Sequence, residues 1–68
     1  MQINVFFDRE NKEKTIEVDD NSSVKDLLSI MDVNPVTVIV SRENNIILED
    51  DKINDKDKIK LISVISGG

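Results

Sequence analysis

The residues of this chain best suited to chemistry are its last two, Gly67 and Gly68. They are its only glycines, and at average glycine usage a given pair of positions is Gly-Gly about 0.5% of the time. Because glycine has no Cβ atom, a backbone of two glycines can approach another surface closely. A carboxylate at such an end could enter a narrow active site on another protein. The alternative is an ordinary chain end without a function.

The other side chains offer little for catalysis within the chain. Cysteine and histidine are absent, which excludes disulfides, thiolate nucleophiles and the usual general base. The serines Ser22, Ser23 and Ser29 therefore have no histidine to activate them. The acidic residues between positions 49 and 57 lack the spacing and the glycine of an EF-hand, so we expect a solvated loop there and no metal site. We expect that the chain is not an enzyme and holds no cofactor of its own.

Length and charge restrict the class of partner. The 68 residues form at most one domain, expected to span residues 1–68 and to end in an extended tail. The net charge of −5, without a basic stripe, argues against direct binding of nucleic acid or an anionic membrane. A basic partner surface is the natural complement. No stretch is long and apolar enough to span a bilayer, and charge appears by Asp8, so we expect no signal peptide and a cytoplasmic protein.

Hydrophobic spacing predicts the strands that must position this end. Five segments have the spacing of strands: residues 2–7, 15–18, 36–40, 46–48 and 58–65. The polar residues 8–12 are expected to form a turn, and Asn44-Asn45 can supply the positive φ of a second hairpin turn. Within the polar connection before the last strand, Ile53 is expected to point inward.

One helix is predicted between the second and third strands. Ser23 lies three residues before Asp26, which is the spacing of a capping box with aspartate in place of glutamate. The apolar residues that follow share one helix face: Val24, Leu27, Leu28 and Met31. The helix is expected to end before Asn34-Pro35, because a residue that precedes proline avoids the helical region.

The predicted fold is α+β, a mixed sheet of about four to five strands packed on one α-helix. On the strands, alternate residues are expected to point at the helix: Ile3, Val5, Phe7, Val36, Val38, Val40, Ile59 and Leu61.

The order of elements, the helix opening at residues 23–28 and the ending at residues 57–68 resemble the prokaryotic ubiquitin-like β-grasp proteins. These include the sulfur carriers ThiS and MoaD and the small archaeal modifier proteins. The segment 34–40, followed by a turn and the acidic residues 49–51, is most similar to the archaeal modifiers. The chain departs from the thiamine-type pattern, because Ser66 precedes only two glycines and no glycine stands before the last strand.

This resemblance implies that Gly68 is the site of covalent acyl attachment, with Gly67 and Ser66 as the part of the tail that threads into a partner. That partner would be a ubiquitin-activating-type adenylating enzyme, which uses ATP and holds zinc. A sulfur donor would then give a thiocarboxylate or thioester, for tRNA thiolation or for molybdopterin or thiamine synthesis by a sulfur-accepting synthase. Alternatively, lysines of target proteins would form isopeptides. A non-covalent ubiquitin-like interaction domain, or a small synthase subunit, is the other interpretation.

A docking surface is predicted on the sheet face away from the helix. In a β-grasp sheet the first, third and last strands are neighbours, so the outward residues would cluster beside the tail: Phe6, Ile39, Ile62 and Val64. Exposed apolar patches often mark partner sites. The alternatives are that these are ordinary surface residues or that a dimer covers them. We expect a monomer.

Overall fold

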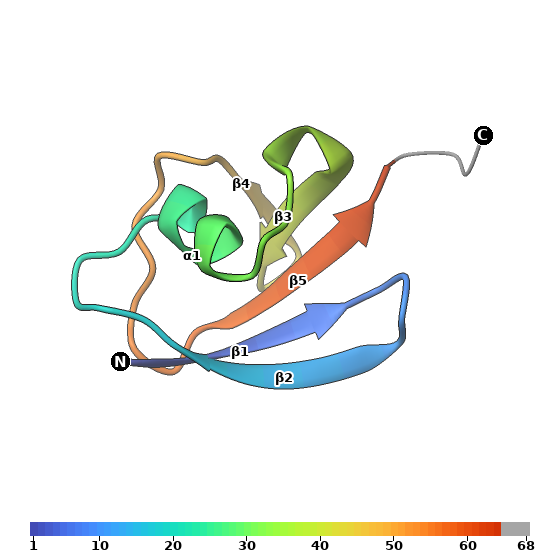
Figure 1. Cartoon of the computed structure of the whole chain (residues 1–68). Coiled ribbons are helices and arrows are strands. Elements are labelled where there is room, and N and C mark those ends of the chain that lie inside the picture. The colour runs from blue at the N-terminus through green and yellow to red at the C-terminus, as the bar shows by residue number, and fades with distance from the viewer. Residues whose placement is uncertain (65–68) are drawn as a thin grey trace.

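The computed structural model describes residues 1–64. Its elements are β1 (Gln2–Phe7), β2 (Lys12–Glu17), α1 (Val24–Ile30), the 3-10 helix η1 (Pro35–Thr37), β3 (Val38–Arg42), β4 (Asn45–Ile47) and β5 (Lys58–Ser63). The five strands form one sheet in the order β2-β1-β5-β3-β4, and α1 packs on one side of it (Figure 1). We call this side the helix side and the opposite one the open face. The predicted mixed sheet on one helix, with the first, third and last strands as neighbours, is confirmed.

The last strand lies in the middle of the sheet. It pairs in parallel with β1 and antiparallel with β3. Because it is hydrogen-bonded on both sides, its position is fixed by two neighbours along its length. After β5 ends, the Val64 N–H still donates to the Thr37 carbonyl at 3.0 Å. The strand that leads to the C-terminal residues is therefore held firmly up to the end of the described chain.

The core lies between the sheet and α1. It contains Val24, Leu27 and Leu28 from the helix, and strand residues that include Ile3, Val5, Val40, Ile59 and Leu61. Ile53 is also buried, as its predicted inward position requires. Of the other residues predicted to point at the helix, Phe7 and Val38 are half-buried against this core. The period-two alternation therefore identified the buried face of β1 and β5 correctly.

The start of α1 is the predicted capping box. The Ser23 hydroxyl accepts from the Asp26 N–H at 3.4 Å, and the Asp26 carboxylate accepts from the Ser23 N–H at 3.0 Å. The second of these bonds favours the charged carboxylate and lowers the pKa of Asp26 below its ordinary value of 3.8.

The helix ends earlier than the sequence predicts, before Met31. Asp32 takes a left-handed conformation with φ of 57°, and the Val33 N–H reaches back to the Leu28 carbonyl at 2.9 Å. This six-to-one bond satisfies a carbonyl at the helix end, which is how a Schellman motif stops a helix. The helix therefore ends through a local hydrogen bond, before the Asn34-Pro35 pair that was expected to end it.

Two predictions for the third strand are wrong. The strand begins at Val38 and not at residue 36, because the Asn34 carboxamide accepts from the Val36 N–H at 3.1 Å and caps the 3-10 turn η1. Val36 consequently lies outside the sheet and is 77% exposed, whereas it was expected to point at the helix. The hairpin turn is also displaced by one residue, since Glu43 and Asn44 carry the positive φ angles and Asn45 already belongs to β4.

The boundaries of the predicted second strand and of the predicted last strand also differ in the structure. β2 begins at Lys12 and not at residue 15, because its pairing with β1 continues to the Phe7–Lys12 pair. β5 ends at Ser63, and Ile65, predicted as the end of this strand, lies outside the described residues.

A tight loop brings the chain back to β5. Arg42 of β3 stabilises this loop. The Nη1 atom of Arg42 donates to the Asp57 carboxylate at 3.0 Å and to the Lys52 carbonyl at 3.0 Å. Lys56 takes a φ of 67° in this loop, and its N–H donates to the Gln2 carbonyl at 2.8 Å. A non-glycine residue therefore occupies a left-handed position two residues before β5 begins.

Candidate functional site

The open face brings three of the four predicted docking residues together. Ile39 and Ile62 are direct partners across β3 and β5. Phe6 is paired with Lys60 across β1 and β5, which makes it a diagonal neighbour of Ile62. Because paired residues lie on the same face of a sheet, these side chains form one continuous apolar surface.

Val64, the fourth predicted residue, follows β5 and continues its alternation. Its side chain is 48% exposed, and its backbone is hydrogen-bonded to Thr37. Ile39 is 38% exposed, while Phe6 and Ile62 are half-buried by their neighbours in the sheet. The predicted surface is therefore accessible, and it borders the point where the described chain ends.

Ile46 was not among the predicted docking residues, yet it is 69% exposed. Ser41 pairs with both Ile46 and Lys60, so Ile46 lies on the open face with the predicted residues. The sequence pattern could have predicted this position. A two-residue turn at residues 43–44 or at residues 44–45 pairs Ile46 with a residue that shares the sheet face of Ile39. We call the group Phe6, Ile39, Ile46, Ile62 and Val64 the open-face patch.

The open-face patch has a basic residue within it. The Lys60 ammonium lies 5.9 Å from the centroid of the Phe6 ring, a distance at which the cation is attracted to the ring face. The apolar stem of a lysine also covers neighbouring apolar surface while its charge stays in water. On its other side Phe6 is paired with Glu13 of β2, so a lysine and a glutamate flank this residue on the open face.

The predicted covalent residues Ser66, Gly67 and Gly68 lie outside the described residues. The structure thus describes the surface that leads to them and not the tail itself. Within residues 1–64, no three histidine, cysteine, aspartate or glutamate side chains are grouped so that they could hold a metal ion. In the same residues, no helix has the length and apolar character needed to cross a membrane.

The fold and this face define a class of protein. A five-stranded mixed sheet in the order β2-β1-β5-β3-β4, curved around one helix, is the ubiquitin-like β-grasp fold. The chain belongs to the family described as Small archaeal modifier protein 2, which matches residues 1–65. This confirms the resemblance drawn from the sequence.

Known relatives agree with this assignment. The sulfur carrier protein TtuB of Thermus thermophilus is 31% identical over 55 residues, which are 81% of this chain and 85% of TtuB. SAMP1 from Haloferax volcanii has a similar structure, with a TM-score of 0.76, 16% identity and full coverage of both chains. The thiamine biosynthesis protein ThiS from Geobacter metallireducens has a TM-score of 0.70 and 20% identity, again over the whole of both chains. The two structures share the fold of this chain, while the family match and TtuB place it among sulfur carriers and ubiquitin-like modifiers.

Proposed function

We propose that this chain is a ubiquitin-like carrier whose Gly68 carboxylate is activated by a partner enzyme and then passed on as a thiocarboxylate, a thioester or an isopeptide. Three observations support the proposal: membership of the modifier family, similarity to a sulfur carrier, and the Gly-Gly ending of the sequence. The observation that carries it is that the central strand β5 ends beside an exposed apolar patch, five residues before Gly68.

The chemistry begins at the carboxylate. An oxygen of the Gly68 carboxylate attacks the α-phosphorus of ATP, pyrophosphate leaves, and an acyl-adenylate forms. The carbonyl carbon is then electrophilic, because AMP is a good leaving group. Hydrosulfide that displaces AMP gives a thiocarboxylate, and a partner thiol that displaces AMP gives a thioester. A lysine amine that displaces this thiol gives an isopeptide and returns the thiol.

The chain itself contributes positioning to these steps. The open-face patch would dock on the activating enzyme, and β5 would direct Ser66, Gly67 and Gly68 into its nucleotide site. Two glycines leave no side chains to obstruct a narrow entrance. ATP and zinc would be bound by the activating enzyme and not by this chain. We place these reactions in the cytoplasm, where ATP is available.

Reconstitution with an activating enzyme of the ubiquitin-activating type tests the proposal. With ATP and sulfide, the intact mass of the chain is expected to rise by the replacement of one oxygen by sulfur. A variant that lacks Gly67 and Gly68 should show no such change and no release of AMP. Ser66→Ala is the matched control, because it alters the tail and keeps both glycines.

If the truncated chain is converted as fully as the intact chain, the proposed acyl site is wrong. If the truncated chain binds the enzyme and the intact chain is never adenylated, the protein is a non-covalent interaction domain.

A further inference from the structure

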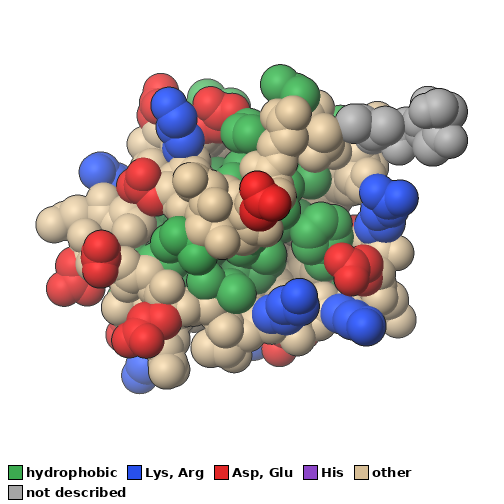
Figure 2. Space-filling model, viewed as in Figure 1, with side chains coloured by type: hydrophobic (Ala, Val, Ile, Leu, Met, Phe, Trp, Pro, Cys, Tyr) green, Lys and Arg blue, Asp and Glu red, His purple; other side chains and the backbone are tan. Residues whose placement is uncertain are grey.

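The helix side of the sheet carries a second, partly uncovered apolar surface. α1 has seven residues and is about 10 Å long, while β1 and β2 have six residues each and span about 20 Å. The helix is therefore too short to cover these strands completely. Phe7, Ile16 and Met31 remain half-buried around the core. Figure 2 shows hydrophobic side chains at the surface between α1 and β2.

The charges on β2 are sorted between its two faces. Lys12 and Lys14 pair with Phe7 and Val5, so they lie on the helix side. Glu13, Thr15 and Glu17, by contrast, pair with the open-face residues of β1. We call Phe7, Ile16 and Met31, together with the bordering Lys12 and Lys14, the β2 strip.

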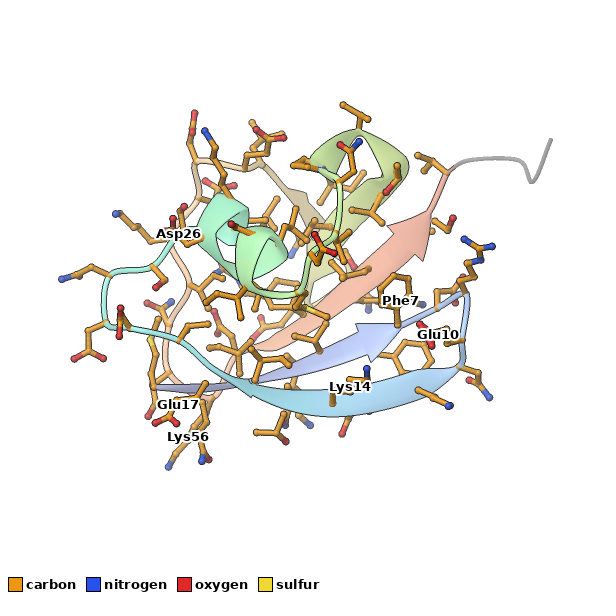
Figure 3. All side chains as sticks on the ribbon, viewed as in Figure 1. Phe7, Glu10, Lys14, Glu17, Asp26 and Lys56 are labelled. Carbon is orange, nitrogen blue, oxygen red and sulfur yellow. The ribbon has the colours of Figure 1, made fainter. Side chains whose placement is uncertain are left out.

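The strip has a basic and an acidic end. Figure 3 shows Phe7 at the end of β1 next to the hairpin turn, Lys14 near the middle of β2 and Glu17 at the far end of β2. Lys14 is a diagonal neighbour of Phe7, and the acidic Glu10 lies in the turn that joins β1 to β2. Beyond Glu17, a pocket is lined by Val18, Ile30 and further acidic residues, Asp19 and Asp20. A bound segment is therefore attracted most strongly if its acidic residues lie next to Lys12 and Lys14, near the hairpin turn.

Within residues 1–64, β2 is also an edge strand, since β1 is the one strand that pairs with it there. Its outer backbone N–H and C=O groups can pair with another extended segment. Lysines on an edge strand discourage non-specific pairing with strands of other molecules. They favour pairing with a strand that carries acidic residues, because opposite charges attract. An added strand would place alternate side chains over the apolar part of the strip, as its neighbour β1 does within the sheet.

We propose that the β2 strip binds an extended segment of a partner protein, in which apolar side chains alternate and acidic residues stand at the end next to Lys12 and Lys14. The segment adds to β2 as a sixth strand. This site lies on the opposite side of the sheet from the open-face patch, so an activating enzyme and such a partner can be bound at once. The inference does not depend on activation of Gly68.

A titration with synthetic peptides, followed by amide chemical shifts of the full chain, tests this site. The probe is a short peptide that alternates valine and threonine and carries an aspartate pair at one end. Its reversed sequence is used as well, because the structure fixes the basic end of the strip and leaves the direction of the added strand open. We expect shifts in β2 and around Met31, with the amides near Ile39 and Ile62 unchanged.

Charge reversal supplies the decisive comparison. The double variant Lys12→Glu, Lys14→Glu should weaken binding at least about tenfold, because two attractive charge contacts become repulsive. Lys58→Glu is the matched control, since Lys58 pairs with Asn4 on the open face. It should bind the peptide as the parent chain does.

A peptide in which lysines replace the aspartates, or in which proline removes the central backbone donors, should bind at least tenfold more weakly. If the double variant does not fold, Lys12→Gln with Lys14→Gln replaces it, with a smaller loss expected. Equal binding by the charge variants, shifts confined to the open face, or no shifts at saturating peptide would each overturn the proposal. None of these results bears on whether Gly68 is adenylated, which the reconstitution measures separately.

Discussion

Replacing Ile46 by serine separates partner docking from folding. This side chain is 69% exposed, so about one third of it is buried in the chain alone. Since complete burial of an isoleucine stabilises by about 3 kcal/mol, the substitution should lower the free energy of unfolding by about 1 kcal/mol or less. If the activating enzyme covers the exposed two thirds, about 2 kcal/mol of binding free energy depends on this residue. Serine keeps the Cβ atom, so part of this contact with the enzyme remains. We therefore expect a loss of affinity of at least about tenfold, which is smaller than the full contribution of about 2 kcal/mol would give.

The assay is the rate of AMP formation as a function of the concentration of the chain, with the activating enzyme and ATP held constant. Ile30→Ser is the control, because Ile30 is 57% exposed, lies in α1 and is absent from the open face. The two residues have similar helix propensities, so the control should also fold. The I46S variant is expected to require about tenfold more protein for half-maximal rate, and the control to match the parent chain. Equal concentration dependence for both variants would refute the docking role of the open-face patch.

Three further predictions concern stability, each measured by chemical or thermal unfolding. Lys56→Gly should stabilise by about 0.5–1 kcal/mol, because Lys56 has a φ of 67° that glycine adopts without a steric cost; lower stability would contradict this. The free energy of unfolding should fall as the pH drops below 3.8, because the pKa of Asp26 is lower in the folded chain and the folded state therefore favours the charged carboxylate. Asp26→Asn should reduce the slope of this free energy against pH. An unchanged slope would contradict the role of the hydrogen bond from Ser23. Leu27→Ala should cost about 2–5 kcal/mol, since Leu27 is fully buried, and a loss below 1 kcal/mol would contradict its place in the core.

The parts of the fold that could be predicted from sequence are those governed by a strong local period. Alternation in residues 2–7 and 58–61 identified the buried face, because a shift by one residue would have turned the core residues of both strands to the open face. The Ser23 and Asp26 spacing located the start of the helix, since both partners of the capping box lie within four residues.

The boundaries that were wrong depend on interactions that the hydrophobic pattern does not contain. Residues 36–40 are β-branched at every position, yet the Asn34 carboxamide caps the turn before them and the strand begins only at Val38. Likewise, β2 extends to Lys12 because Phe7 supplies a partner on β1. For the candidate site, alternation found the open-face patch except Ile46, which requires the pairing of β4 with β3 as well as the spacing along one strand.

The most direct test of the account is the intact mass of the protein purified from its native host, together with tryptic fragments of other host proteins. The account predicts a chain that ends at Gly68, with a fraction in which sulfur replaces one oxygen of that carboxyl group, or host lysines that carry the Gly67-Gly68 remnant. A chain that continues beyond Gly68 and is never processed, or an unmodified carboxyl group with no modified lysines, would contradict it.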